Sequence, residues 1–334
     1  MKNIYSVLKL SQSIRSVRLK LFGVFLLHCF KRRYFALYVD PVLACNLRCR
    51  MCYFSDEEKR KQMKGIFNEE DMEKLANAFF HRALKLQIGC GAEPSLFRHN
   101  KRLIELAKKK GIPYISMTTN GNLFSESDWL ELANAGLDEV TLSLHGTRRD
   151  TYEYFMAGAD FDRFLSAMET LTKIKEIHPA FKVRLNYTVN NDNLAELKDF
   201  FRVFAGYKID VLQIRPIQPL GNTVYSDFSW EAIYASYDSI MENLKNECQK
   251  RKIIGIIPDK QDMVKETNSD SRLVDAAYFY VSPRCCWSED FDLSVDTYES
   301  YSRRTCRGWK LLKDVFCNSP KSDNDKRHLN YKVN

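Results

Sequence analysis

Short apolar runs alternate along most of this chain with longer stretches whose apolar residues recur at helical spacing. The apolar runs predict buried β-strands at 38–44, 86–89, 114–119, 139–144, 183–189 and 211–216. The periodic stretches predict helices near 69–82, 99–110, 126–135, 161–177, 193–205 and 230–251. Strands that alternate with helices of this length form right-handed βαβ units around a parallel sheet. The pattern therefore predicts an α/β protein whose residues 38–252 form a partial (β/α)6 barrel of TIM-like architecture.

Residues 1–37 have a different pattern. Apolar residues recur at helical spacing from Ile4 to Phe25 and basic residues fall mostly between them, which predicts a basic amphipathic helix. Its most apolar run, residues 21–30, is shorter than the roughly twenty residues that a bilayer-spanning helix needs. Two main interpretations stay open. The helix packs against the barrel, or residues 1–36 lie on an anionic membrane surface; docking to a partner protein is a third.

The composition indicates a soluble globular protein, and its net charge is local. Of 334 residues, 45% are hydrophobic and 28% are charged. The formal charge of +8 belongs to the N-terminal segment, where eight basic residues precede the first acidic one, Asp40. Because the rest of the chain is balanced and no recognised nucleic-acid module appears, we do not expect nucleic acid as a partner.

The ten cysteines are unevenly distributed, and Cys45, Cys49 and Cys52 share one loop after the first predicted strand. A zinc site normally needs four protein ligands, and a disulfide framework is typical of small secreted chains. Three thiolates on one loop can instead bind three irons of a [4Fe–4S] cluster and leave the fourth iron open. Metal ligation of this kind favours a reducing compartment, so we expect a cytoplasmic protein, at most peripheral to the inner face of the membrane.

Unusual residues follow several of the other predicted strands, at the ends where parallel barrels build their sites. They fall in Gly89–Pro94, Thr118–Gly121 and Ser143–Gly146. In the last predicted strand, Gln213 and Arg215 alternate and therefore share a face. Since a strand buried on both sides is nearly all apolar, these two residues indicate a polar ligand inside the barrel. The alternative is that Arg215 pairs with a structural carboxylate.

The cysteine spacing C-x3-C-x2-C and the ordered strand-end motifs together resemble the radical S-adenosylmethionine (SAM) superfamily over residues 38–216. The resemblance implies that the three cysteines bind the cluster and that Gly91 to Pro94, with Ala92 in place of a second glycine, meets the amino group of SAM. The residues that it implies for cofactor binding are Gly91, Ala92, Glu93, Pro94, Thr119, Asn120, Ser143 and Met51.

The sequence departs from the superfamily pattern at three further positions. Met51 stands where an aromatic residue is common, which affects only packing against adenine. Met156 stands where relatives often have an arginine paired with the SAM carboxylate, so Arg184 or Arg215 would have to supply that charge. His145 replaces a frequent aspartate and is interpreted either as a structural histidine or as a proton donor at the mouth of the barrel.

Residues 253–334 form a predicted C-terminal extension that resembles the strand-hairpin module called SPASM or, when shortened, twitch. That module holds auxiliary iron–sulfur clusters in peptide and sulfatase maturases. The resemblance implies one auxiliary cluster, held by Cys285 or Cys286 together with Cys306 and Cys317. The alternative is a decayed module whose thiols pack in an apolar interior. The isolated residues Cys29, Cys90 and Cys248 are assigned no metal.

The resemblance also implies the reaction. One electron from the reduced cluster, supplied by a flavodoxin or ferredoxin type of donor, cleaves SAM to a 5′-deoxyadenosyl radical that abstracts hydrogen from substrate. The leading hypothesis is a maturase-like enzyme acting on a peptide, protein or small molecule. The alternative is a radical SAM enzyme without an auxiliary cluster, acting on a lipid or glycan-related metabolite near the membrane. A non-catalytic electron carrier or scaffold is a third class, which the SAM-binding motifs disfavour.

Overall fold

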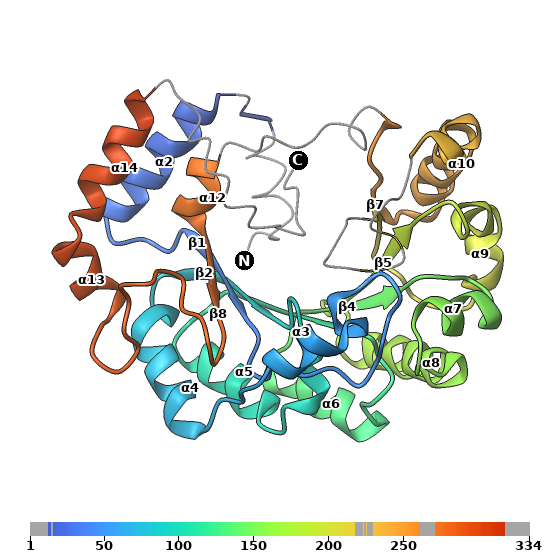
Figure 1. The fold of residues 1–334 in the computed structure, drawn as a ribbon, viewed down its shortest axis with the longest axis horizontal. Coiled ribbons are helices and arrows are strands. Elements are labelled where there is room, and N and C mark those ends of the chain that lie inside the picture. Colours follow the sequence, from blue (N-terminus) through green and yellow to red (C-terminus); the bar gives the residue numbers. More distant parts are fainter. Residues whose placement is uncertain are drawn as a thin grey trace.

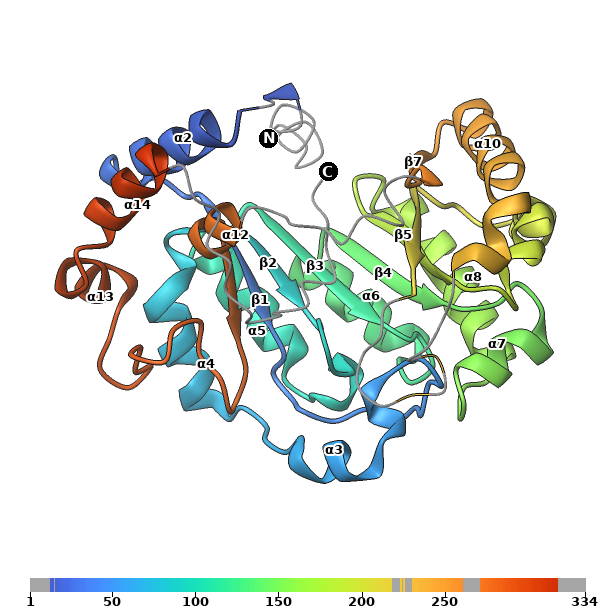
Figure 2. The same cartoon turned by 45° about the horizontal axis from the view of Figure 1, so that its top comes forward.

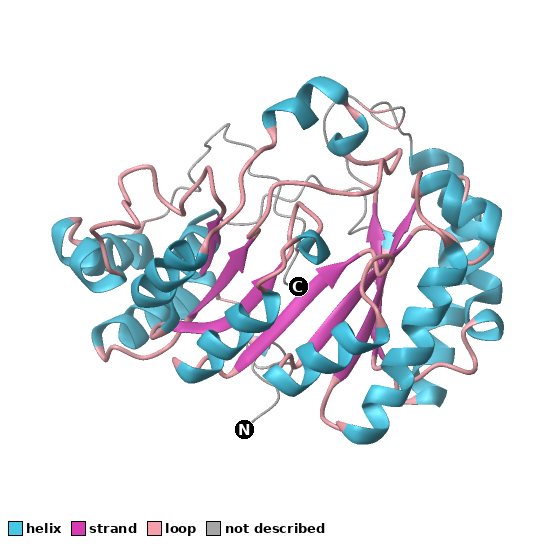
Figure 3. Cartoon of the chain, turned by 90° about the horizontal axis from the view of Figure 1, so that it is seen from below, coloured by secondary structure: helices cyan, strands magenta, loops and turns pink. Residues whose placement is uncertain are grey.

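In the computed structural model, the described residues are 13–317 without 15, 218–222, 224, 226–229 and 261–270. They form an eight-stranded sheet in the order β7-β6-β5-β4-β3-β2-β1-β8, in which every neighbouring pair is parallel (Figure 1). Helices α4, α5, α6 and α8 run along one side of this sheet, and Figure 3 shows helices in front of the strands. The predicted α/β class and the partial barrel are confirmed.

The sheet joins consecutive strands side by side and adds the last strand of the chain to the first. The strands are β1 (Phe35–Val39), β2 (Ala83–Ile88), β3 (Tyr114–Thr119), β4 (Glu139–Leu144), β5 (Lys182–Val189), β6 (Val211–Pro216), β7 (Ile254–Ile256) and β8 (Tyr278–Val281). The helices are α2 (Val17–Cys29), α3 (Glu57–Gln62), α4 (Glu69–Leu75), α5 (Asn100–Lys109), α6 (Glu126–Ala135), α7 (Arg149–Phe155), α8 (Phe161–Ile177), α9 (Phe200–Val203), α10 (Tyr234–Arg251), α12 (Ser271–Ala277), α13 (Tyr298–Arg304) and α14 (Arg307–Phe316).

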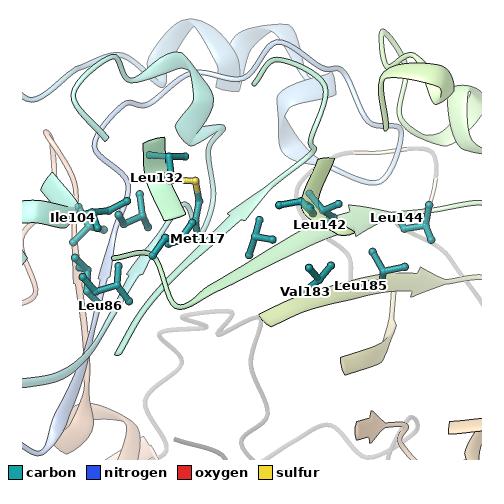
Figure 4. Close-up of a cluster of buried hydrophobic side chains, with 14 of the residues drawn as sticks. Leu86, Ile104, Met117, Leu132, Leu142, Leu144, Val183 and Leu185 are labelled. Atoms are coloured by element: carbon teal, nitrogen blue, oxygen red, sulfur yellow. The ribbon is translucent and has the colours of Figure 1, made fainter. Parts of the chain in front are cut away.

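Strands β2 to β6 each separate an apolar face from a polar one. The apolar face packs on the helices, where Leu86, Met117, Leu142 and Val183 belong to one buried cluster and Met117 lies beside Leu132 of α6 (Figure 4). Side chains of the other face alternate with these, and most of them are polar. On this polar face, side chains of neighbouring strands from β2 to β6 lie in register. The pairs are Gln87–Ser116, Thr141–Arg184, Ser143–Asn186, Asn186–Gln213 and Thr188–Arg215. The polar surface predicted from β6 alone thus extends over five strands.

Local capping signals set the positions of several helices. Ser125 and Asp128 form a reciprocal capping box at the start of α6, and Gly136 ends the same helix with a φ of +107°, which favours glycine. The carboxylate of Asp160 accepts hydrogen bonds from two backbone N–H groups in the first turn of α8. These helices therefore lie where their periodicity predicts them.

The C-terminal part differs from the predicted strand hairpin. β7 extends one edge of the main sheet and β8 pairs with β1 at the other, so residues 253–281 complete the sheet as far as they are described. Beyond β8, the described chain forms a short turn and the helices α13 and α14. β1 also begins before the predicted strand and ends at Val39, because Asp40 and Pro41 leave the ladder.

The N-terminal helix α2 packs on α12 and α14 (Figure 2). Its Leu21 is buried among Ala276, Leu311 and Val315. The part of the predicted helix before Ser13 lies outside the described residues. The prediction of an amphipathic helix is wrong for α2, because its exposed side also carries leucine and phenylalanine side chains. No helix in the described part of the chain is long and apolar enough to cross a membrane.

Candidate active site

The cysteine loop, residues 41–52, follows the carboxyl end of β1 and brings three thiols together. Cys45, Cys49 and Cys52 are all free and half-buried. Burial raises the pKa of Cys45 to about 12, and burial together with the two neighbouring thiols raises the pKa of Cys49 well above its ordinary value. A metal that binds here must therefore displace thiol protons, which couples its affinity to pH.

Backbone hydrogen bonds fix the cysteine loop against the segment after α7. The N–H of Arg48 donates to the carbonyl oxygen of Ala157 at 2.8 Å, and the N–H of Arg50 donates to that of Phe155 at 2.9 Å. Leu47, directly before Arg48, is buried in the main core. The side chain of Arg50 lies over the ring of Tyr154, 4.1 Å from its centroid. The loop is thus held from both its backbone and its side chains.

Met51, predicted to pack against adenine, has protein partners of its own. It is buried in a small cluster with Phe155 and Ile217, and its sulfur lies 3.3 Å from the side-chain nitrogen of Asn190. Met156, where relatives often have arginine, is also buried and apolar, so the charge for a SAM carboxylate has to come from elsewhere in the chain.

A buried carboxylate that the sequence analysis missed, Asp40, organises the loop after β2. Its Oδ1 accepts the N–H of Cys90 at 2.7 Å, and its Oδ2 accepts the N–H of Gly91 at 3.0 Å and the hydroxyl of Tyr280 at 2.8 Å. Burial still leaves the pKa of Asp40 above its ordinary value. The signal in the sequence was an acidic residue placed directly after an apolar strand. Gly91 has no room for a side chain, because a Cβ would stand 2.5 Å from the hydroxyl of Tyr53.

Glu93 ties this loop to the end of β3. Its carboxylate accepts hydrogen bonds from the hydroxyls of Thr119 and Ser95, both at 2.6 Å, and from the N–H of Asn120 at 2.9 Å. Asn120 in turn donates from its side chain to the amide oxygen of Asn46 in the cysteine loop, at 2.9 Å. The predicted residues Glu93, Thr119 and Asn120 therefore do come together, in one network that reaches the cysteine loop. Pro94 is buried beside them, and Ala92 is half-buried.

Two buried polar atoms close to the predicted Ser143 lack a partner. Ser143 lies on the polar face near the carboxyl end of β4, in register with Asn186. Within the described residues, Oδ1 of Asn186 and Nδ1 of His145 have no hydrogen-bond partner. Burial and the positive charge of Arg215 lower the pKa of His145 to about 4, so this imidazole is neutral at pH 7. Buried acceptors without donors are costly, which favours a ligand at this position.

The two candidate arginines lie at opposite ends of the sheet. Arg184, near the amino end of β5, forms an ion pair with Glu139 at 2.9 Å and donates to Gln213 at 3.1 Å. Arg215 lies near the carboxyl end of β6, in register with Thr188. The expectation that either arginine could serve the SAM carboxylate is therefore corrected. Only Arg215 lies at the end of the sheet where the cysteine loop begins.

The C-terminal cysteines are not gathered into one ligand set. Cys306 and Cys317 flank α14, one at each end, so their Cα atoms are about 16 Å apart at 1.5 Å per residue. Side chains as short as cysteine cannot bring sulfurs at that separation onto one cluster. Cys285 is exposed, whereas Cys286 packs against the core, where burial raises its thiol pKa to about 12. The predicted auxiliary cluster is incompatible with this helix.

The cysteine loop does fit a [4Fe–4S] cluster. In the described part of the chain, no three His, Cys, Asp or Glu side chains are close enough to hold one metal ion. A cluster makes a different demand, because each thiolate binds its own iron and the sulfurs stand farther apart. The loop offers three free thiols with two ordered polar networks beside them.

Comparison with known proteins indicates the family to which the chain is similar. Residues 39–204 match the family model described as the Radical SAM superfamily. A protein from Saccharolobus solfataricus named probable GTP 3′,8-cyclase is 26% identical over 257 residues, which are 76% of this chain and 77% of that protein. A protein of the same name from Saccharolobus islandicus is 28% identical over 180 residues, so the matched part spans 55% of that relative.

Solved structures share the fold at low sequence identity. Streptococcus suis SuiB bound to S-adenosylmethionine has a TM-score of 0.60 and 14% identity, over 82% of this chain and 67% of that one. Methylornithine synthase (PylB) has a TM-score of 0.50 and 17% identity, over 92% and 95% of the two chains. At these identities the likeness concerns the fold alone.

Proposed function

This chain belongs to the radical SAM superfamily of enzymes, and from that premise we propose that it abstracts hydrogen from a small polar substrate using a single [4Fe–4S] cluster. The observation that carries the proposal is the hydrogen-bonded connection from the cysteine loop through Asn120 to Glu93. It links the cysteine loop to the Gly91–Pro94 loop at the carboxyl end of the sheet, which supports a shared site for the cluster and SAM there.

Each residue of this unit has a separate task. Cys45, Cys49 and Cys52 would hold three irons of the cluster. With SAM bound, the reduced cluster would supply the electron that cleaves a carbon–sulfur bond of SAM and so starts radical chemistry. The backbone at Gly91, fixed by Asp40, would meet the amino group of SAM. Arg215 would balance the SAM carboxylate at the carboxyl end of β6.

Asn186 would position the bound molecule. Its amide oxygen is buried without a donor in the described chain, and a hydroxyl or amine of SAM or substrate would satisfy it. Neutral His145 beside it would hold or accept a proton without adding charge. These two residues thus favour a ligand with several hydrogen-bonding groups.

The polar inner face supports a small polar substrate. Relatives that resemble the chain over at least half its length are named probable GTP 3′,8-cyclases, so a purine nucleotide is one candidate. The maturase hypothesis loses its main support, because α14 separates the cysteines of the auxiliary cluster. The alternative weighed from the sequence, an enzyme without an auxiliary cluster, is therefore the better proposal. It needs a one-electron donor of the flavodoxin or ferredoxin type, and a cytoplasmic location would keep its thiols reduced.

The decisive experiment measures iron and 5′-deoxyadenosine after anaerobic reconstitution. The wild-type chain should bind about four irons and release 5′-deoxyadenosine from SAM under reduction. Replacing Cys45, Cys49 and Cys52 by alanine should remove both, whereas the matched variant Cys29→Ala, at an exposed and isolated cysteine, should change neither. Protein with an intact cluster that releases no 5′-deoxyadenosine would exclude the proposal. About eight irons per chain would support the auxiliary-cluster hypothesis instead.

The substrate class is tested in the same assay. GTP, other polar metabolites and short peptides are added in turn, and the consumption of each is followed by mass spectrometry. A small polar molecule should be consumed in step with 5′-deoxyadenosine release. If only a peptide were consumed, the result would contradict the small-substrate proposal and favour the maturase hypothesis.

A further inference from the structure

Helix α2 exposes apolar side chains on the side that faces away from the protein. Leu19, Phe22, Leu26 and Phe30 follow one another at three- and four-residue steps and are all exposed, Phe30 by 72%. The opposite side of the helix buries Leu21 completely. A helix that packs on one face normally carries polar residues on the other, and α2 contains no acidic residue at all. Its outer face is unusual for a surface helix.

The neighbouring helix α14 has the same feature. Trp309 and Phe316, seven residues apart and therefore on one face, are each 74% exposed. The two helices lie side by side (Figures 1 and 2). They run in opposite directions, because Gly308 at the start of α14 lies beside His28 at the end of α2, and Val315 lies in the cluster with Leu21.

The exposed members of both helices are called the α2–α14 surface. They are Leu19, Phe22, Leu26, Phe30, Trp309 and Phe316. Exposed basic residues accompany them, namely Arg18, Lys31, Arg32, Lys310 and Lys313. Of these, Lys313 lies on the same face of α14 as Trp309 and Phe316. Asp314 of α14 is half-buried, so the exposed charges that accompany the large apolar side chains are all basic.

We propose that the α2–α14 surface docks the protein onto an anionic membrane. Phenylalanine, leucine and tryptophan side chains would enter the headgroup region, where aromatic rings are favoured, and the basic side chains would contact lipid phosphates. A two-fold contact with a second copy fits less well. An isologous interface would bring the basic residues of both copies together, and like charges repel.

Docking would leave the proposed active site accessible. α2 leads into the amino end of β1, whereas the cysteine loop leaves from its carboxyl end. The surface also lies on different elements from the strand-end networks of the site. The inference is therefore independent of the proposed function, and either one can fail without the other.

The test uses sedimentation of the full chain with lipid vesicles. Wild type should bind vesicles of phosphatidylglycerol and phosphatidylcholine, bind pure phosphatidylcholine much less, and be weakened by about 0.5 M salt, which screens exposed charges. A four-residue surface variant loses the apolar contacts, so its affinity for anionic vesicles should fall at least about tenfold. Its substitutions are Phe22→Ser, Phe30→Ser, Trp309→Ser and Phe316→Ser.

A matched variant separates this surface from general hydrophobicity. Ile177→Ser with Val295→Ser removes side chains that are 65% and 79% exposed elsewhere, and it should bind vesicles as wild type does. Lys310→Gln with Lys313→Gln should weaken binding to anionic vesicles only. Thermal unfolding and SAM cleavage should be the same in all variants, since the changed residues are exposed.

Three outcomes would overturn the proposal. In the first, the wild-type protein stays in the supernatant. In the second, the four-residue surface variant binds anionic vesicles as well as wild type does. In the third, the Ile177/Val295 variant loses as much vesicle binding as the four-residue surface variant. Sedimentation equilibrium tests the alternative, which is self-association of the protein. A dimer that the four-residue surface variant abolishes, in protein that does not bind anionic vesicles, would assign the α2–α14 surface to self-association.

Discussion

Asp40 connects parts of the protein that are far apart in the sequence. One carboxylate receives hydrogen bonds from the loop after β2, through Cys90 and Gly91, and from β8, through Tyr280. Such a buried acceptor is stable only while its donors remain in place. The position of the proposed SAM-binding backbone at Gly91 thus depends on a side chain that belongs to neither the cysteine triplet nor the Gly91–Pro94 motif.

Replacing Asp40 by asparagine should weaken both the fold and SAM binding. The amide nitrogen would face an N–H or hydroxyl donor, which leaves buried groups unsatisfied and costs about 1–3 kcal/mol. Tyr280→Phe removes only one donor and should cost less. Denaturant unfolding and SAM titration of the reconstituted protein measure the two effects. Unfolding of Asp40→Asn at the wild-type midpoint would contradict this role.

His145 should make stability depend on pH on the acid side. Its folded pKa of about 4 lies below the ordinary 6.5, so between these values the unfolded chain binds a proton that the folded chain does not. The free energy of unfolding should therefore fall as pH drops from 6.5 towards 4, by up to about 3 kcal/mol from this group. Arg215 is the charged group that contributes to the shift, and its charge is constant over this range.

The variant His145→Gln isolates this contribution. Its free energy of unfolding should decrease less steeply than that of wild type between pH 6.5 and 4, as measured by denaturant titrations at each pH. Half-buried His28, whose pKa is also lowered to about 4, contributes equally to both proteins. His99→Gln, at an exposed histidine, is the control. Equal slopes for wild type and His145→Gln would refute the assignment.

The sequence indicates which cysteines would bind a cluster, but not which residues hold their loop in place. Cys45, Cys49 and Cys52 carry their chemistry in their spacing. Asp40 and Asn186 do not, because their importance depends on donors that are present or absent in three dimensions. The choice between Arg184 and Arg215 follows from their places near the start of strand 183–189 and near the end of strand 211–216.

At the scale of elements, α14 is the feature that argues against an auxiliary iron–sulfur cluster. As a continuous helix it holds Cys306 and Cys317 about 16 Å apart. The double variant Cys306→Ala and Cys317→Ala should therefore keep the iron content and the rate of 5′-deoxyadenosine release. Cys49→Ala, measured in parallel, should lose both. A drop of about four irons in the double variant would mean that α14 unwinds to bind metal.

The sequence predicted most elements closely, and the exceptions have a common cause. β3, β4, β6, α6 and α8 match their predicted ranges, because periodicity, caps and turns are local signals. β7 and β8 were missed, since both are short, and β8 in addition pairs with β1, far from it in sequence order. The strand-hairpin expectation for the C-terminus failed for the same reason. β8 finds its partner in β1 instead of in an adjacent strand.

At the scale of the whole molecule, Arg82 fastens the two described ends of the chain to the barrel. Its buried guanidinium donates to the carbonyl oxygens of Arg32 at 3.0 Å and His28 at 3.1 Å, and forms an ion pair with Glu299 of α13. The segment after α2, the start of β2 and the C-terminal helices thus share one buried cation. Removing its partner would leave that charge partly uncompensated.

Glu299→Gln should consequently destabilise the protein by about 2 kcal/mol, below the range for fully buried pairs because Glu299 is about one-third exposed. Glu73→Gln breaks an ion pair with Arg102 in which both side chains are about half exposed, and it should cost at most about 0.5 kcal/mol. Chemical denaturation of the two variants measures the difference. Equal midpoints would show that Arg82 does not depend on Glu299.

The pairing of β8 with β1 has a consequence for biosynthesis. A ribosome makes β1 long before β8, so the nascent barrel carries an open strand edge while the chain between them is synthesised. Open edges invite wrong pairing, and contacts between distant segments form slowly. Tyr280 reaches Asp40 only when β8 docks, so an incomplete chain lacks that hydrogen bond. The loop that would receive SAM is therefore completed only once β8 has been made and has docked.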